Sequence, residues 1–148
     1  MVLLVPYDGS ALAASALARA VEFGDLRGEE VLVLSVLPDD PEFARDRGWI
    51  DEGEAYDRDR VAAAFEERVA ATAPGATFRV EHPDDVSAQA WTAVDVARTI
   101  RQVAHDVDPS IVFIGSENAG RVTRPVTSVG SPISEDPQYD VHIVRHAE

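Results

Sequence analysis

The sequence predicts an α/β fold in which a doubly wound parallel sheet forms a single domain over residues 1–148. A chain of 148 residues is long enough for one domain with its own core. Short continuous apolar runs, such as Val2 to Pro6, are typical of strands that helices cover on both faces. These runs alternate with stretches of helical periodicity, which indicates right-handed βαβ units and therefore a parallel sheet.

Several segments are expected to form the strands of this sheet. Most are buried apolar runs, whereas residues 77–81 alternate between polar and apolar side chains. Gly115 ends the fourth run. The expected strands are residues 2–6, 31–37, 77–81, 111–114 and 141–144.

Other segments have the spacing of amphipathic helices. The first follows Ser10, which can cap it, and stops at Gly24. The second ends before Pro74, and the third extends from about residue 86 to residue 107. Their apolar faces consist of Val61, Phe65 and Val69 in the second helix, and of Val96, Ile100, Val103 and Val107, widened by Trp91 and Val94, in the third.

The acidic segment from Pro38 to Asp57 interrupts the alternation of strands and helices. Pro38-Asp39-Asp40-Pro41 ends the second strand, and the residues after it have only weak periodicity. The large side chains of the segment are Phe43, Trp49, Ile50 and Tyr56. The segment is therefore either a lid or a loop that its aromatic side chains pin to the domain, and the pinned loop is the favoured interpretation.

The composition excludes several classes of function. The chain has 27 acidic residues, 13 basic residues, a net charge of -14 and no cysteine. Disulfides, thiolate catalysis, thiolate zinc sites and iron–sulfur clusters are therefore excluded. All basic residues are arginine, which also excludes a phosphate-loop lysine and Schiff-base chemistry. The negative charge argues against nucleic acid or an anionic membrane surface as a partner.

The sequence also carries signals about where the protein works. The apolar stretches are far shorter than the roughly eighteen residues of a membrane helix, and the N-terminus lacks the pattern of a signal peptide, so we expect a cytoplasmic protein. In molar salt the screening length falls to about 3 Å, which removes most self-repulsion of so acidic a chain. The acidity favours a halophilic origin, and the alternative is a GC-rich genome that favours Arg and Ala codons.

The loops at the carboxyl ends of the first and fourth strands are the expected ligand site, because doubly wound sheets bind ligands where the strand order reverses. The first loop reads VPYDGS and places Asp8 just past a strand and at the start of a helix. Asp8 can accept a hydrogen bond from a ribose hydroxyl or bind a nucleotide-bound magnesium ion. It can equally serve only to cap the helix, and both interpretations stay open.

The loop after the fourth strand combines glycines, hydroxyls and arginines. From Asn118 to Ser134 it contains Arg121 and Arg124 but no acidic residue, where the average composition would give about three. An arginine-bearing segment without acids is what an anion site requires in so acidic a protein. The predicted phosphate cradle consists of Gly115, Ser116, Gly120, Gly130 and Ser131, and the alternative is an ordinary loop whose glycines serve turns.

The strand ending in VPYDGS, the alanine-rich helix after it and the late strand entering a Gly/Ser loop resemble the universal stress protein family over the whole chain. The resemblance implies a Rossmann-like (HUP-like) fold with strand order 3-2-1-4-5. It also implies that ATP or AMP, with or without magnesium, binds at the two loops. Pro6, Asp8 and Val36 would then line the adenine and ribose side.

The glycine loop departs from the pattern Gly-x2-Gly-x9-Gly-Ser/Thr, with which nucleotide-binding members of the family hold phosphates. Gly120, Gly130 and Ser131 match its later part, whereas four residues instead of two separate Gly115 from Gly120. After Gly130, the segment from Ser131 to Pro137 has room for barely one helical turn, whereas family members have a full helix there. Because a helix N-terminus contributes positive potential, this truncation weakens the assignment of ATP.

The sequence predicts neither an active site nor a metal site. Ser10 and Ser116 are candidate nucleophiles, but their spacing supports no pairing with a histidine base, whether His82, His105, His142 or His146. We therefore expect a binding protein and not an enzyme. It is either a nucleotide-binding stress-response module or a dimeric interaction module without nucleotide. The last strand is expected at a sheet edge, and the resemblance implies a homodimer through it.

Overall fold

The computed structural model describes residues 1–83, 92–118 and 139–147, and within them the strands form one five-stranded sheet in the order β3-β2-β1-β4-β5. The strands are β1 (Val2–Pro6), β2 (Glu30–Val36), β3 (Thr77–Glu81), β4 (Ile111–Gly115) and β5 (Asp140–Val144). Each neighbouring pair runs parallel. The predicted α/β fold class and strand order are therefore confirmed.

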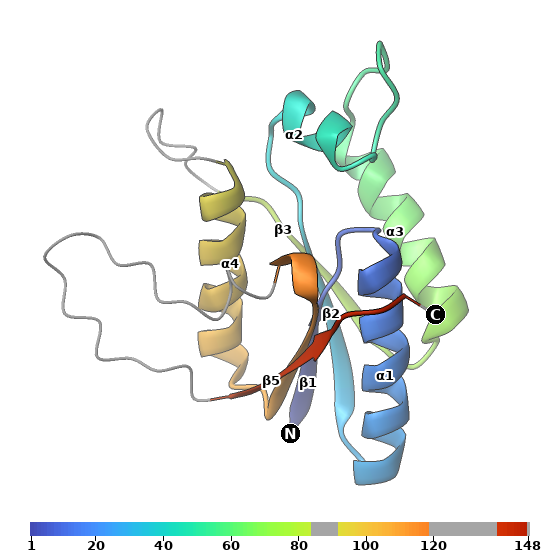
Figure 1. The fold of residues 1–148 in the computed structure, drawn as a ribbon, viewed down its shortest axis with the longest axis vertical. Helices are drawn as coiled ribbons and strands as arrows, with labels where there is room; N and C mark the ends of the chain where they lie inside the picture. Colours follow the sequence, from blue (N-terminus) through green and yellow to red (C-terminus); the bar gives the residue numbers. More distant parts are fainter. Residues whose placement is uncertain (84–91, 119–138, 148) are drawn as a thin grey trace, which may run out of the picture.

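Helices cover both faces of the sheet (Figure 1). On one face lie α1 (Ala11–Arg27) and α3 (Arg58–Thr72), and on the other lies α4 (Thr92–Val107). Successive residues of β1 enter different cores, since Leu3 belongs to the cluster under α1 whereas Leu4 belongs to the cluster under α4. Both side chains are fully buried. The unbroken apolar run of β1 is thus the consequence of burial on two faces.

The first helix ends later than the sequence predicted. Ser10 caps it as expected, since its Oγ accepts a hydrogen bond from the Ala13 amide at 3.1 Å. The helix then runs through Gly24 to Arg27, and Gly28 is its left-handed C-cap with φ +68°. The prediction that Gly24 stops the helix is wrong. Gly24 instead allows the backbone of Glu29 to approach the helix closely. Its carbonyl accepts from the amides of Gly28 and Glu29, and an added Cβ would lie 2.7 Å from the Glu29 carbonyl oxygen.

The other two long helices bury most of the apolar residues that were predicted to face the core, but Val94 of α4 belongs to neither core cluster. Val61, Phe65 and Val69 are the buried residues of α3. In α4, Ile100 and Val103 are buried, while Val96 and Val107 pack at the margin of the same core. The predicted start of this helix near residue 86, together with Trp91, lies outside the described residues.

Aromatic side chains attach the segment between β2 and α3 to the domain. Trp49 lies at its centre, with its ring centroid 5.6 Å from that of Phe43, 6.4 Å from that of Tyr56 and 5.7 Å from that of Phe65 in α3. The hydroxyl of Tyr56 donates to the Pro38 carbonyl at 3.0 Å, and burial raises the pKa of Tyr56 to about 12. Its aromatic side chains therefore pin the segment to the domain, which confirms the favoured interpretation.

This segment also contains a short helix that sequence reasoning missed, α2 (Pro41–Asp46). Asp40 is its N-cap, with Oδ1 accepting from the Phe43 amide at 3.1 Å, and Pro41 occupies the first turn. The Thr92 hydroxyl at the start of α4 donates to Asp40 Oδ2 at 2.6 Å and is the main cause that lowers the pKa of Asp40. Asp40 therefore fixes α2 and joins it to α4.

The close approach at Gly24 can be tested by adding one methyl group. Gly24→Ala is expected to lower the free energy of unfolding by about 1–3 kcal/mol, because the new Cβ meets backbone that cannot yield cheaply. Gly75→Ala is the matched control, since a Cβ there meets nothing within 4 Å. It should change the stability by less than about 0.5 kcal/mol. Equal stabilities of the two variants in urea unfolding would contradict this account.

The junction at Asp40 makes a second prediction. Asp40→Ala is expected to lower the free energy of unfolding by about 1–2 kcal/mol near neutral pH, because the N-cap and the Thr92 hydrogen bond are both lost. The exposed neighbour provides the control variant Asp39→Ala, expected to have an effect below about 0.5 kcal/mol.

The pH dependence of that difference has a definite sign. The folded state lowers the pKa of Asp40 from 3.8, so the ionised carboxylate stabilises the fold above that pH. This contribution is lost as the pH falls through the folded-state pKa. The stability difference between wild type and Asp40→Ala should therefore shrink in acid, and a difference that grows below pH 3.8 would contradict the assignment.

Candidate functional site

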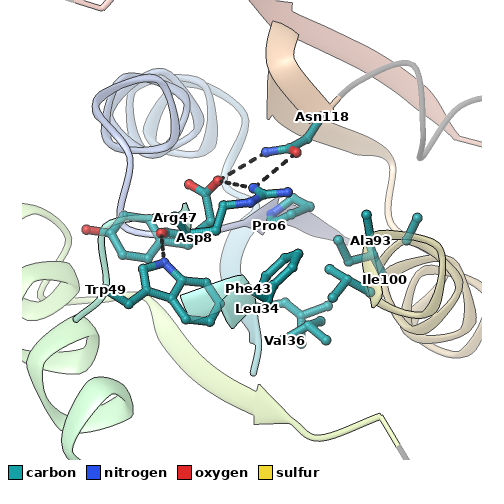
Figure 2. A pocket seen from close by; sticks show the side chains of 13 residues that line it. Pro6, Asp8, Leu34, Val36, Phe43, Arg47, Trp49, Ala93, Ile100 and Asn118 are labelled. Atoms are coloured by element: carbon teal, nitrogen blue, oxygen red, sulfur yellow. Dashed lines mark hydrogen bonds and ion pairs between the residues drawn. The ribbon is translucent and has the colours of Figure 1, made fainter. Parts of the chain in front are cut away.

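A pocket opens at the carboxyl edge of the sheet, beside the central strand (Figure 2). Its walls come from the ends of β1 and β2, from the segment containing α2, from the first turns of α4 and from the turn after β4. This is the position at which doubly wound sheets bind ligands. The lining residues are Pro6, Tyr7, Asp8, Leu34, Val36, Phe43, Arg47, Trp49, Ala93, Val96, Ala97, Ile100 and Asn118.

One side of the pocket is an apolar slot between β2 and α4. Leu34 and Val36 at the end of β2 face Ala93 and Ile100 of α4, with Pro6 beside them (Figure 2). Such a slot can hold a flat ring system, which gains free energy by leaving water. The structure thus brings together Pro6, Asp8 and Val36, which the family resemblance assigned to one ligand.

The opposite side of the pocket is polar and centres on Asp8. Its Oδ1 accepts from the Ser10 amide at 3.0 Å. Its Oδ2 accepts from Arg47 Nη1 at 3.0 Å and from Asn118 Nδ2 at 3.1 Å, and Arg47 Nη1 also donates to Asn118 Oδ1 at 3.4 Å. Asp8 therefore joins the loop after β1, the segment after α2 and the turn after β4 (Figure 2).

The hydrogen bonds of Asp8 bear on the two interpretations of this residue. Ser10 caps α1, so Asp8 only supports the turn before it. A carboxylate has about four acceptor positions, and the described residues use three of those on Asp8, which leaves one for a hydroxyl of a ligand. A magnesium ion does not fit as well, because the positive charge of Arg47, 3.0 Å from Oδ2, already offsets the charge of this carboxylate. Nor do the described residues include a cluster of metal-ligating side chains.

Sequence reasoning missed Arg47, Phe43 and Trp49 as site residues. The guanidinium of Arg47 lies over the Phe43 ring, 4.8 Å from its centroid. The indole Nε1 of Trp49 donates to the Asp8 carbonyl at 2.7 Å. The segment after β2 therefore binds both the backbone carbonyl and the side chain of Asp8. The sequence did offer one indication of this role, because the segment follows β2 and therefore begins at the same edge of the sheet as Asp8.

The predicted phosphate cradle lies only partly within the described residues. Gly115 ends β4, and its lack of a side chain serves packing, since a Cβ there would lie 2.9 Å from Leu12 Cβ of α1. Ser116 begins the turn that carries Asn118 to the pocket. Counted from Gly115, a Gly-x2-Gly spacing would put its second glycine at position 118, where this chain has Asn118. Gly120, Gly130 and Ser131 lie outside the described residues.

The histidines of the described residues stand apart from the pocket lining. His82 Nδ1 lies 3.1 Å from the Leu37 carbonyl oxygen, and the ring of His142 stacks on Phe113 with 5.0 Å between centroids. The Ser10 hydroxyl accepts the capping hydrogen bond of α1. The helices within the described ranges include none with the length and apolar character that a bilayer span needs.

Comparisons with solved structures agree with this fold. A universal stress protein family member from Burkholderia pseudomallei is 20% identical, with a TM-score of 0.58 over 97% of this chain and 94% of that one. A universal stress protein in complex with cAMP is 21% identical, with a TM-score of 0.54 over 100% of this chain and 98% of that one. A third, from Archaeoglobus fulgidus in complex with dAMP, is 19% identical, with a TM-score of 0.52 over 97% and 95%.

No curated protein matches the chain in sequence. The sequence pattern of one family, however, extends over residues 1–145 and thus includes every strand and helix described above. The chain belongs to the universal stress protein family.

Proposed function

We propose that this protein is a nucleotide-binding stress-response module that takes an adenine nucleotide, AMP or ATP, in the pocket beside β1. The observation that carries the proposal is the meeting of an apolar slot with the carboxylate of Asp8 at the switch point of the sheet. Complexes of structural relatives with cAMP and dAMP support it.

In this proposal the adenine ring occupies the slot formed by Leu34, Val36 and Ile100. A ribose hydroxyl donates to the acceptor position that remains on Asp8. The phosphates extend toward the loop after β4, where the resemblance assigns Gly115, Ser116, Gly120, Gly130 and Ser131. Because Arg47 already pairs with Asp8, the nucleotide binds without a magnesium ion held by that carboxylate.

The protein would act through occupancy of the site and not through catalysis, as expected from the sequence. The concentrations of AMP and ATP follow the energy state of the cell. The fraction of the protein with bound nucleotide would therefore follow that state, and no reaction would be needed. A cytoplasmic location and the adaptation of the acidic chain to high salt stay predictions.

Filling the adenine slot tests the proposal. Ala93 lies on α4 in the pocket wall, so Ala93→Trp places an indole where the base would lie. Calorimetric titration in multimolar potassium chloride should detect AMP binding to wild type, and the variant should bind at least about tenfold more weakly. The matched control is Ala18→Trp, the same change at an exposed position of α1, which should bind as wild type does.

Two outcomes would count against nucleotide binding in this slot. One is a wild-type protein that binds neither AMP nor ATP at millimolar concentration. The other is an Ala93→Trp variant that folds, as judged by its cooperative unfolding, and still binds AMP with wild-type affinity.

An exposed sheet edge favours a second role, as a dimeric interaction module. In the described part of the chain β5 pairs with β4 alone, so its other edge presents unpaired backbone groups (Figure 1). Ile143 on this strand is 38% exposed, which is unusual for a large apolar side chain in a sheet. We propose that two copies of β5 meet in a self-complementary homodimer.

Light scattering in multimolar salt tests this interface, because salt screens repulsion between two subunits that each carry a charge of -14. Wild type should have the mass of a dimer. Ile143→Asp should have the mass of a monomer, since it places like charges near the two-fold axis. Leu26→Asp is the control, because Leu26 is 85% exposed at the far end of α1. A wild-type monomer, or a dimeric Ile143→Asp, would refute the interface.

A further inference from the structure

Arg47 lies in the pocket, although an adenine base has no need of a cation there. Its side chain is 24% exposed, and its Nη1 donates to Asp8 and Asn118. The Nε and Nη2 groups donate to none of the residues that the structure describes. A guanidinium has five N–H donors in a fixed planar arrangement that matches the oxygens of a phosphate. Arg47 thus has donors left for an anion in the pocket.

The fold holds this guanidinium in place before any ligand arrives. The Phe43 ring centroid lies 4.8 Å from the guanidinium carbon, and the Phe43 and Trp49 rings pack in a T-shaped arrangement. Trp49 is in turn hydrogen-bonded to the Asp8 backbone. Because these contacts already order the side chain, an anion that binds there loses less affinity to conformational entropy. Figure 2 shows the guanidinium between the Asp8 and Asn118 side chains at the polar side of the pocket.

The charge of the chain makes a cation in the pocket favourable for an anionic ligand. With a net charge of -14, the protein repels a phosphate unless a local positive group offsets that repulsion. Among the described residues that line the pocket, Arg47 is the one cation. Asp8 beside it is the acceptor, so the pocket offers one anion contact and one hydroxyl contact next to each other.

The spacing of these two contacts selects a class of ligand. Arg47 and Asp8 are paired through Nη1 and Oδ2 at 3.0 Å, so the donors left on Arg47 and the acceptor position left on Asp8 Oδ1 belong to adjacent side chains. A ligand that uses both residues must therefore carry a phosphate and a hydroxyl donor close together. A nucleoside monophosphate meets this requirement, because one ribose carries both groups. Asn118 meanwhile donates to Asp8 Oδ2 at 3.1 Å, so that oxygen carries two hydrogen bonds and Oδ1 keeps the position for a ligand hydroxyl.

We infer that Arg47 binds the phosphate attached to the ribose and thereby makes this pocket a site for nucleoside monophosphates, open or cyclic. This inference rests on the proposed function. It adds to that function the residue that distinguishes a nucleotide from its nucleoside. It assigns the contact with Arg47 to the first phosphate, so the second and third phosphates of ATP gain nothing from this residue.

The test compares the affinities of adenosine, AMP, cAMP and ATP for the full chain by calorimetric titration in one buffer of fixed salt concentration. For wild type, AMP should bind about tenfold to a hundredfold more tightly than adenosine, as expected for a charge-assisted hydrogen bond. ATP should bind no more tightly than AMP. Arg47→Met should remove most of the gain from adenosine to AMP and to cAMP. The gain is measured as the ratio of affinities within each variant, so a loss of adenosine affinity through the contact with Asp8 does not affect it.

Two further variants separate this contact from other effects. Arg45→Met removes the same charge from an exposed position of α2 and should keep the wild-type ratio of AMP to adenosine affinity. Arg47→Lys keeps the charge without the planar arrangement of donors and should recover part of the gain. It also provides a measurement if Arg47→Met disturbs the Asp8 loop, which thermal unfolding would reveal.

The outcomes distinguish this inference from the function on which it rests. If wild type binds adenosine and AMP equally, or if Arg47→Met keeps the AMP preference, Arg47 is not the phosphate contact although the adenine slot stands. A much tighter binding of ATP than of AMP would overturn the preference for monophosphates. If wild type binds neither adenosine nor any of the nucleotides, the proposed function fails and this inference fails with it.

Discussion

Burial of β1 on both faces is the constraint on which the rest of the structure depends. Leu3, Leu4 and Val5 are each inaccessible to solvent, since one helical layer covers the side of Leu3 and the other covers the side of Leu4. A shift of this strand by one residue would move each side chain into the other core, where a different set of side chains is packed around it. The end of β1 is therefore fixed, and with it the direction in which the chain presents Asp8 at the carboxyl edge. The position of the candidate site therefore depends on the core beneath it.

At that edge, the Asp8 side chain connects segments that are distant in the sequence. Its Oδ2 accepts from a residue 39 positions later and from one 110 positions later in the sequence. Arg47 reaches it because Asp40 caps α2 and Trp49 packs between Phe43 and Phe65. The segment after β2 is thus a wall of the pocket. The Thr92 hydrogen bond to Asp40 joins that wall to α4 on the opposite side of the apolar slot.

The sequence was sufficient to predict the elements whose signal is local. Apolar runs identified the strands, and the spacing of Val61, Phe65 and Val69 identified the buried face of α3. Gly24 was misread because a glycine that allows close backbone approach and a glycine that ends a helix look alike in sequence. Asp40-Pro41 was read only as the end of a strand, although the same pair caps α2. Pro6, Asp8 and Val36 were placed at one site through family resemblance. Arg47 could not be, since its role depends on how the segment after β2 folds back onto Asp8.

The pairing of Asp8 with Arg47 also bears on how the proposed anion site would be compatible with so acidic a protein. An isolated arginine at a partly buried position would lose hydration without compensation, and an isolated aspartate would repel any phosphate. Together they form a nearly neutral pair 3.0 Å apart, so the site is stable without a ligand. A ligand that brings both a hydroxyl and a phosphate complements each member of the pair without separating them. A free inorganic anion would gain the contact with Arg47 but suffer the charge of Asp8. Under the proposal, the pair would therefore favour ligands whose negative charge and hydroxyl group belong to the same sugar.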